Sequence, residues 1–305
     1  MSKIAYLFPG QGSQYAGMGK DLYAGHPGAQ ACFDMADDVL GFRLSDILFG
    51  DDEAALKETQ NTQPALYVHS MAVLAAMDDA ADDMHAVAGH SLGEYTALTV
   101  AGALTFEDGL MLVRLRGELM ADAGARRPGA MAALIGMEDA AVDALCAELS
   151  RPDSLVQAAN FNSPGQIVIS GDEDAVARVV EAAPDRGARR AIPLPVSGAF
   201  HSPLMEYAIP GLAAGLKEVE LREPRVPVYL NVTAEPTSDP EAIQKYLLEQ
   251  LTAPVRWAQT LAAMQRDGVT EFVEIGAGKV LSGLVKRTLG KDAGTRAIGT
   301  LEDLI

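Results

Sequence analysis

The chain has 305 residues, a mass of 32.1 kDa and a formal charge of -18, with 49% hydrophobic and 22% charged residues. This composition is that of a globular protein with one large domain or two unequal ones, and it excludes a disordered or fibrous chain. The acidic balance argues against nonspecific nucleic-acid binding, because phosphate neutralisation requires a basic face.

The two cysteines and the apolar run at the N-terminus indicate in which cellular compartment the protein is expected. Cys32 and Cys146 lie in separate apolar helical patterns, so neither a disulfide framework nor a cysteine metal site is predicted. A short apolar run that stops at Pro9 predicts a first strand rather than a signal peptide. No stretch approaches the roughly 20 apolar residues of a membrane span. We therefore expect a cytoplasmic protein that binds neither membrane nor nucleic acid.

Strand-like and helix-like runs alternate through the first 125 residues. Strands are predicted over 4–8 and 86–88, and helices over 65–77, 94–101 and from 106 to about 121. Such alternation is typical of a parallel sheet that is covered by helices.

The pattern changes after residue 127. The next segments read strand, helix, strand, strand, helix and strand, over 130–135, 138–149, 155–160, 166–170, 172–183 and 188–193. This order is that of a ferredoxin-like unit. From residue 197 the larger alternation resumes, with strands predicted over 228–232 and 271–275.

The predicted organisation is therefore a large α/β domain that an insertion divides in two. The large domain takes residues 1–127 and 197–305, and the small inserted subdomain takes 128–196. No internal repeat or low-complexity tract is evident in the sequence.

Gly89-His90-Ser91-Leu92-Gly93 follows a predicted strand and precedes a predicted helix. A serine on such a strand-to-helix turn has an exposed hydroxyl, and the flanking glycines allow the bend and a close approach by other groups. Ser91 is therefore a candidate nucleophile.

A serine hydroxyl needs a base within hydrogen-bonding reach, usually a histidine. His90 adjoins Ser91, but we expect its side chain to point away from the serine. Three histidines lie in segments without a turn or a glycine: His26, His69 and His85. His201 lies in a loop where the insertion rejoins the large domain, and loops on a rigid scaffold often carry catalytic groups. His201 is therefore the predicted base.

An arginine lies on an apolar helix face. Thr105 to Asp108 resembles a capping box, and on the helix that follows, Arg116 falls at the centre of the apolar face while Arg114 falls opposite, in solvent. That face consists of Gly109, Leu112, Val113, Leu119 and Met120. A buried guanidinium stays charged and needs an anionic partner. The partner is either a protein carboxylate or a substrate carboxylate, and we favour the substrate because this helix follows the one that begins after Ser91.

The loop after the first strand reads Phe8-Pro9-Gly10-Gln11-Gly12-Ser13-Gln14. It is not a phosphate loop, because Met18 follows Gly17 where that motif needs lysine. What remains is a backbone that permits close approach and an amide at Gln11, which are parts of an oxyanion hole. The backbone N–H of Leu92 would join them, since it follows the candidate nucleophile.

With these features the chain resembles the malonyl-CoA:acyl carrier protein transacylases of fatty-acid synthesis and the related acyltransferase domains of polyketide synthases. The matching motifs, in order, are Phe8-Pro9-Gly10-Gln11-Gly12-Ser13-Gln14, Gly89-His90-Ser91-Leu92-Gly93-Glu94-Tyr95, Arg116, Asn160-Phe161-Asn162-Ser163-Pro164-Gly165-Gln166, Gly198-Ala199-Phe200-His201, and Gln250 ahead of Pro254-Val255-Arg256-Trp257. The resemblance covers nearly the whole chain. It implies an α/β fold, with a hydrolase-like core built on a parallel sheet and an inserted ferredoxin-like α+β subdomain.

The resemblance also implies the chemistry. Ser91 would attack the malonyl thioester, His201 would take and return the proton, and Arg116 would bind the free malonyl carboxylate. A backbone carbonyl near Gln250 would orient the histidine in place of an acid. The acyl group would then pass from coenzyme A to an acyl carrier protein by a ping-pong route, with no cofactor and no metal.

Further residues are implied to bind the substrates. Phe200 resembles the malonyl-type pattern, in which a bulky side chain crowds a branched α-carbon, and Met120, Asn160 and Asn162 would line the site. Both substrates are anionic, so a monomer with this net charge needs a local basic surface. Two clusters are candidates for that surface: Arg189 and Arg190, and Lys279, Lys286 and Arg287.

Three alternatives remain open. A serine esterase or thioesterase would want an acid between Ser91 and His201 in chain order, and it would have no use for Arg116 on an apolar face. A discrete polyketide acyltransferase would use the same chemistry with a different carrier protein. A catalytically silent carrier-binding module would not need to retain all three residues.

Overall fold

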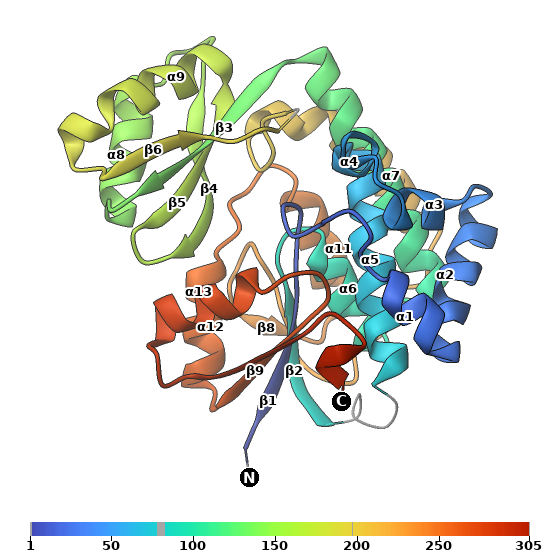
Figure 1. Ribbon diagram of the computed structural model, residues 1–305. Helices are drawn as coiled ribbons and strands as arrows, with labels where there is room; N and C mark the ends of the chain where they lie inside the picture. The colour runs from blue at the N-terminus through green and yellow to red at the C-terminus, as the bar shows by residue number, and fades with distance from the viewer. Residues whose placement is uncertain (1, 78–82, 197, 305) are drawn as a thin grey trace.

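Two β-sheets organise the protein (Figure 1). The computed structural model describes residues 2–77, 83–196 and 198–304. The larger sheet has the strand order β10-β9-β1-β2-β7-β8. Its strands are β1 (Ile4–Phe8), β2 (Met84–Gly89), β7 (Val228–Tyr229), β8 (Pro236–Thr237), β9 (Glu271–Ile275) and β10 (Gly294–Ile298).

The strands of the larger sheet run parallel, except for the β7–β8 pair at one edge. Phe8 at the end of β1 pairs with Gly89 at the end of β2. The carboxyl ends of both central strands therefore meet at one edge, which is where ligands bind in open α/β sheets. The loop with Gln11 and the turn with Ser91 both leave from this edge.

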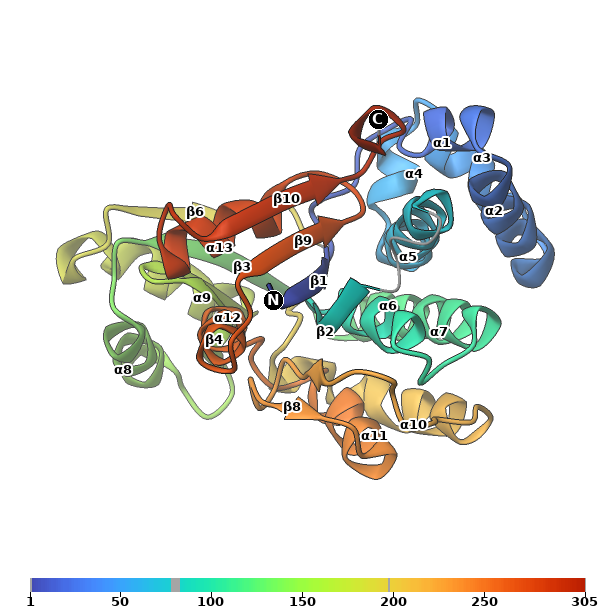
Figure 2. The same cartoon turned by 90° about the horizontal axis from the view of Figure 1, so that it is seen from below.

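Helices cover both faces of the larger sheet (Figure 2). One face carries α5 (Thr59–Ala76), α6 (Gly93–Val100) and α7 (Phe106–Arg126), and the other carries α12 (Trp257–Arg266) and α13 (Val280–Leu289). The remaining helices of the large domain are α1 (Lys20–Gly25), α2 (Pro27–Leu40), α3 (Leu44–Phe49), α4 (Glu53–Lys57), η3 (Pro203–Ala208), α10 (Ile209–Lys217), α11 (Pro240–Glu249) and η4 (Glu302–Leu304). No helix in the described ranges is long and apolar enough to cross a membrane.

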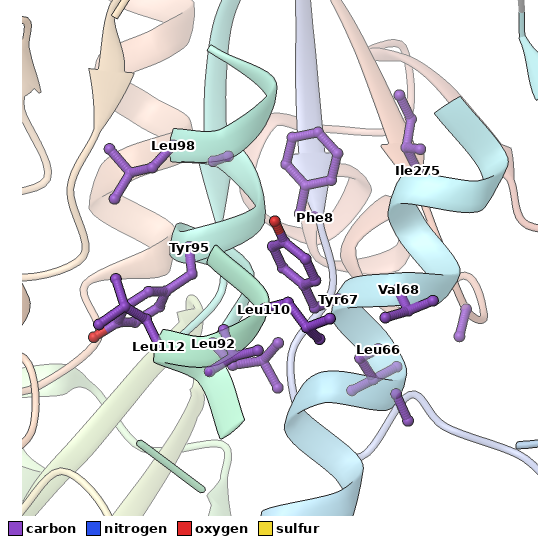
Figure 3. Packing of buried hydrophobic residues seen from close by; sticks show 14 of the residues in the cluster. Phe8, Leu66, Tyr67, Val68, Leu92, Tyr95, Leu98, Leu110, Leu112 and Ile275 are labelled. Carbon is purple, nitrogen blue, oxygen red and sulfur yellow. The ribbon is translucent and has the colours of Figure 1, made fainter. Parts of the chain in front are cut away.

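Alternate residues of β1 enter different cores, because successive strand side chains point to opposite faces. Ala5 and Leu7 pack under α12 and α13, whereas Phe8 packs with α5, α6 and α7. Figure 3 shows Phe8 with Tyr67 of α5 and Leu98 of α6 in this second core. Burial of one such side chain stabilises the fold by about 1.5–3 kcal/mol. The turn after β2 therefore lies among well-packed helices and strands, which hold it in place.

The smaller sheet is antiparallel and has the order β4-β5-β3-β6. Its unit consists of β3 (Gly129–Ile135), α8 (Asp139–Leu149), β4 (Val156–Ser163), β5 (Gln166–Asp172), α9 (Glu173–Ala182), η2 (Pro184–Arg186) and β6 (Arg190–Pro193). The unit has its own core, which includes Leu134, Val142 and Ile169. This is the ferredoxin-like arrangement that the sequence predicts, so the expected fold class is confirmed. The exact domain boundaries stay a prediction, and residue 197 lies outside the described residues.

Backbone hydrogen bonds join the two units. Val255 of the large domain donates its N–H to the carbonyl of Ala159 at 2.8 Å, and its carbonyl accepts from Phe161 N–H at 2.9 Å. These bonds form an isolated parallel bridge between β4 and the segment that leads into α12. The inserted unit is therefore held against the edge where the candidate site residues lie.

Some element bounds differ from prediction. The strand predicted over 228–232 ends at Tyr229, because the chain then turns and Ala234 donates its N–H back to the carbonyl of Leu230. The strand predicted to end at residue 160 continues to Ser163. The helix predicted to end near residue 121 continues to Arg126, whereas its start is as expected, with the Thr105 side chain accepting from the N–H of Asp108.

Candidate active site

The turn after β2 holds its serine in an unusual conformation. Ser91 has φ 53°, in the left-handed region that non-glycine residues rarely adopt. A Cβ on Gly89 would collide with the backbone of Gly93, and a Cβ on Gly93 would collide with the carbonyl of Phe8. Both glycines are therefore required by close backbone packing, and the turn presents the Ser91 side chain at the edge of the sheet.

Ser91 and His201 form a hydrogen-bonded pair. Ser91 Oγ lies 2.8 Å from His201 Nε2, and His201 Nδ1 lies 2.8 Å from the backbone carbonyl of Gln250. A carbonyl oxygen only accepts, so Nδ1 carries the imidazole proton and Nε2 is free to accept from the serine hydroxyl. His201 is itself left-handed, with φ 57°.

The environment keeps His201 neutral. The imidazole is 3% exposed, and burial followed by the charge of Arg116 lowers its pKa to about 3. The unprotonated form, which a general base requires, is therefore the resting form at neutral pH.

Arg116 reaches the same serine from α7. The residue is 1% exposed, its Nη2 donates to Ser91 Oγ at 3.1 Å and to Gln250 Oε1 at 2.8 Å, and its Nη1 donates to Gln63 Oε1 at 2.8 Å. All three partners are neutral oxygens, although the buried carboxyl of Glu94 also acts on it electrostatically. Burial lowers the pKa of Arg116, so the site holds a desolvated charge beside the serine hydroxyl.

The prediction that Arg114 lies in solvent is wrong. Its Nε donates to Glu118 at 2.6 Å, while its Nη1 donates to the Gln60 carbonyl at 2.9 Å and to Asn61 Oδ1 at 3.0 Å. Its guanidinium also lies over the ring of Phe42, at 5.1 Å from the centroid. The helix face opposite Arg116 is partly covered because α7 packs along α5, so two arginines on one helix are bound to α5.

A cavity of about 560 Å³ opens above the serine. The predicted residues that line it are Gln11, Ser91, Leu92, Arg116, Met120, Asn160, Asn162, Phe200 and His201. Gln250 lies behind them, fully buried. Neither Gln11 nor Leu92 uses its backbone N–H in a hydrogen bond within the described part of the chain, so both donors are available to a ligand.

The predicted docking residues lie outside this cavity. Arg189 and Arg190 are exposed near the start of β6, and Lys286 is exposed on α13. Lys279 lies 4.0 Å from Asp303 in an exposed ion pair. Arg287 alone bonds a residue that lines the cavity, through Nη1 to the Gln166 side-chain oxygen.

Four polar residues around the site escaped prediction from the sequence. Gln63 accepts from Arg116, and Gln157 donates its amide to the His201 carbonyl at 2.8 Å. Asn231 accepts from the N–H of Ser91 at 2.7 Å, and Glu94 accepts from the N–H of Asn231 at 2.6 Å. The position of Asn231 just after a parallel strand is a signal that could have identified it.

The serine on a strand-to-helix turn, the histidine held by a carbonyl and the buried arginine define, with this fold, a serine acyltransferase of the α/β class. The acyl transferase domain family matches residues 5–302 of the chain. The chain belongs to this family, and to the malonyl CoA-acyl carrier protein transacylases within it, which confirms the resemblance found in the sequence motifs.

The relatives cover nearly all of the chain. A malonyl CoA-acyl carrier protein transacylase of Bacillus subtilis (strain 168) is 48% identical over 287 residues, which are 94% of this chain and 90% of the relative. One from Staphylococcus aureus (strain MRSA252) is 42% identical over 304 residues, 100% of this chain and 98% of the relative.

Solved structures agree with these relatives. The acyl-carrier-protein-S-malonyltransferase from Bartonella henselae has a TM-score of 0.94 at 43% identity, covering 99% of this chain and 97% of its own. A malonyl-transacylase in complex with a type II polyketide synthase acyl carrier protein has a TM-score of 0.94 at 40% identity, covering 99% and 98%.

Proposed function

We propose that the protein transfers a malonyl group from malonyl-CoA to the phosphopantetheine thiol of acyl carrier protein in fatty-acid biosynthesis, through a malonyl-serine intermediate. The observation that carries the proposal is that one atom, Ser91 Oγ, lies 2.8 Å from His201 Nε2 and 3.1 Å from Arg116 Nη2. A nucleophile, its base and a buried cation thus converge on one point. The relatives bear names that state the same activity.

The first half-reaction forms the acyl-serine. His201 Nε2 takes the hydroxyl proton as Ser91 Oγ bonds to the thioester carbonyl carbon, and the backbone N–H groups of Gln11 and Leu92 bind the carbonyl oxygen as it becomes negative. The carbon–sulfur bond then breaks, and the coenzyme A thiolate leaves with the proton from His201. The second half-reaction reverses these steps with the carrier thiol as the nucleophile.

Arg116 would select the acyl group. The free carboxylate of a malonyl group is separated from the thioester carbonyl by one methylene, so a cation within 3.1 Å of Ser91 Oγ is close enough to receive it. The carboxylate would replace the serine hydroxyl as a partner of the guanidinium. An acetyl group brings no anion and leaves the buried charge without one.

The other cavity residues would shape the acyl and pantetheine sites. Phe200, which is 6% exposed, would crowd a branched α-carbon, and Met120 would pack beside the malonyl group. Asn160 and Asn162 would offer amides to the pantetheine chain; Asn162 already contacts His90, with Oδ1 2.9 Å from Nε2. No cofactor is needed for this chemistry, and we place the enzyme in the cytoplasm as a monomer.

The second candidate function differs only in the recipient. A solved relative is a malonyl-transacylase in complex with a polyketide synthase carrier protein, so a discrete polyketide acyltransferase is the alternative. The chemistry would be the same for both, and only the carrier protein separates them.

Intact-protein mass spectrometry tests the proposal. Malonyl-CoA should add one malonyl group to the wild-type chain and none to Ser91→Ala, and addition of a carrier protein should remove the group far faster than water does. No adduct would overturn the proposal, and rapid loss in water would identify a thioesterase. Parallel reactions with fatty-acid and polyketide carrier proteins decide between the two recipients.

A further inference from the structure

We infer that Asn231 is a positioning residue for the nucleophile: its side-chain amide continues the parallel sheet past the end of β7 and holds Ser91 in its left-handed conformation. The inference rests on the proposed function only in taking Ser91 as the nucleophile. Asn231 itself faces none of the reacting atoms, and it acts through the backbone of the turn.

The sheet stops just before the nucleophile. β2 pairs with β7 through Val87 with Val228 and through Ala88 with Tyr229, and the chain after Tyr229 turns away. The backbone of β7 therefore offers no partner to the strand end that leads into Ser91. A turn that leaves its groups without partners at this point would be free to relax.

The amide of Asn231 supplies the missing partners. Its Oδ1 accepts the N–H of Ser91 at 2.7 Å, and its Nδ2 donates to the carbonyl of Gly89 at 2.7 Å. One planar amide thus binds the residues on either side of His90, with one donor and one acceptor as in a sheet ladder. Asn231 thus fixes the two peptide groups that lead into Ser91, while the Gln250 side-chain amide donates to the Ser91 carbonyl on the other side at 3.1 Å. The φ angle of 53° at Ser91 is kept because the peptide groups before and after it are both bound.

Asn231 is itself fixed from several sides. It is 0% exposed, its N–H donates to Glu94 Oε2 at 2.6 Å, and its carbonyl accepts from Arg256 N–H at 2.9 Å. The Gln250 amide also approaches its Oδ1 at 3.5 Å. The side-chain amide cannot rotate without breaking its two bonds to the turn. The backbone of Asn231 is fixed by its bonds to α6 and to the segment before α12, so the residue is a rigid reference for the serine.

The bond between Asn231 and Ser91 determines which backbone groups can bind the oxyanion of the substrate. Because the N–H of Ser91 is already used by Asn231, the serine does not provide an oxyanion donor, and the donors in the turn and its neighbouring loop are Leu92 and Gln11. If the amide were lost, Ser91 N–H would be released and the turn could relax toward right-handed geometry. Oγ would then leave its position between His201 and Arg116.

The test is the rate constant of acylation by malonyl-CoA, with substrate affinity measured separately. Asn231→Ala should acylate about 100-fold more slowly, the effect of a displacement near 1 Å, while the dissociation constant of malonyl-CoA, measured in a Ser91→Ala background, stays within about threefold. Asn61→Ala is the matched control, because it removes a buried amide of α5 that bonds Ala55 and Arg114 away from the cavity.

A rate for Asn231→Ala within about threefold of wild type, or an equal loss in Asn61→Ala, would overturn the inference. Wild-type protein is assayed first. If it forms no malonyl adduct, the result refutes the proposed function but does not bear on the role of Asn231.

Asn231→Asp provides a second test if the alanine variant does not fold. A protonated carboxyl can accept from Ser91 and donate to the Gly89 carbonyl, whereas the ionised form cannot donate. Burial disfavours ionisation of a carboxyl at this position, since Asn231 is 0% exposed. Glu94, whose own pKa burial raises to about 8, contacts the same residue, and the cationic Arg116 and the neutral His201 also face this region.

The reaction of Ser91 with a neutral organophosphorus probe should therefore speed up in Asn231→Asp as the pH falls from about 8 to about 5, relative to wild type. Carbon-13 NMR follows the ionisation of the introduced carboxyl in parallel. A rate equal to that of wild type at a pH where this carboxyl is ionised would show that donation to Gly89 is irrelevant and would overturn the inference.

Discussion

The hydrogen bonds of Arg116 within the described residues all go to neutral oxygens, and this predicts how the acyl group is chosen. Without the guanidinium, the malonyl carboxylate loses its partner while an acetyl group loses nothing, so Arg116→Ala should reduce the preference for malonyl-CoA over acetyl-CoA by about 100-fold or more. The ratio of kcat/KM for the two thioesters measures this.

Arg114→Ala is the matched control for that measurement. Arg114 lies on the same helix and also bonds residues of α5, but it does not line the cavity. A preference that survives in Arg116→Ala, or that falls equally in both variants, would exclude Arg116 as the carboxylate site.

The pKa of His201 predicts the acid limit of the serine's reactivity. Burial, and then the charge of Arg116, lowers that pKa to about 3, so the neutral base persists as the pH falls. Reaction of wild-type Ser91 with a neutral organophosphorus probe should stay nearly constant down to about pH 5, whereas an ordinary histidine would lose activity below about pH 6.5.

Arg116→Gln removes one of the causes that lower the pKa of His201, the others being burial and the neighbouring His90, and should move this acid limit to higher pH, because the imidazolium is then less repelled. A loss of reactivity below about pH 6.5 in wild type, or a loss at the same pH in both proteins, would contradict the conclusion that Arg116 lowers the pKa of His201.

Residues with a strong local signal could be predicted from the sequence, whereas their supports could not. Ser91 lies in a motif, His201 in a junction loop, and Arg116 stands out because a charge interrupts an apolar helix face. Asn231 and Gln157 are ordinary amides in the sequence, and their role depends on contacts with residues far along the chain. Only the fold creates such contacts, so no local pattern marks them.

At the scale of elements, α6 lies so close to β1 that Gly93 has no room for a side chain. The Cβ of an alanine there would collide with the Phe8 carbonyl, so Gly93→Ala should lower the free energy of unfolding by about 1–3 kcal/mol. Denaturant unfolding measures the change.

Gly283→Ala in α13 is the matched control, since its Cβ would meet only Arg287 Nη2, at 4.0 Å. Alanine should stabilise that helix by up to about 1 kcal/mol. Equal effects at the two glycines would argue against tight packing between α6 and β1.

The contact of β4 with the histidine loop predicts a catalytic effect from the inserted unit. Gln157 Nε2 donates to the carbonyls of His201 and Thr252, at 2.8 and 3.0 Å, and so ties the two segments that hold the imidazole. Gln157→Leu should lower kcat about tenfold or more and leave the KM of malonyl-CoA nearly unchanged, because it shifts the base without touching the substrate site.

Gln259→Leu serves as its control, because the amide of Gln259 also bridges the two units, through Asp139 at 3.5 Å, but away from the cavity. If both variants behave alike, the effect reflects the joining of the units and not the histidine.

Elements differ in how well the sequence predicts them. β1, β2 and β9 are short apolar runs, and β3 to β6 alternate with helices in a recognisable order, so the fold class could be predicted. The sequence patterns do not predict α1, α3, α4 or the edge strand β10, because these helices have six, six and five residues and the strand, Gly-Thr-Arg-Ala-Ile, has little apolar character. The 14-residue α2 is also not predicted. Such elements are stabilised by tertiary contacts more than by local preference.

The protein is strongly acidic, so it repels anionic partners unless part of its surface is basic. With a net charge of -18, productive encounter with a carrier protein depends on a local basic surface. Lys286 and Arg287 are exposed on α13, and Arg287 reaches Gln166 at the cavity. Reversing both charges to Glu should lower kcat/KM for the carrier protein about tenfold at low salt, with a smaller loss at high salt.

Lys245→Glu on α11 is the control for a general change in charge, because Lys245 is exposed and lies outside the cavity lining. Unchanged carrier kinetics and salt dependence in the double variant would remove this cluster as a docking surface and leave Arg189 and Arg190.

The bond between Asn231 and Ser91 spans 140 positions of the chain. A growing polypeptide therefore exposes its serine motif long before the amide that completes the turn has been synthesised, and the whole inserted unit is made in between. If Asn231 positions the nucleophile as inferred above, an incomplete chain carries the serine without the geometry that makes it reactive. We therefore expect unfinished molecules to consume no thioester, because reactivity would arrive only after Asn231 is in place.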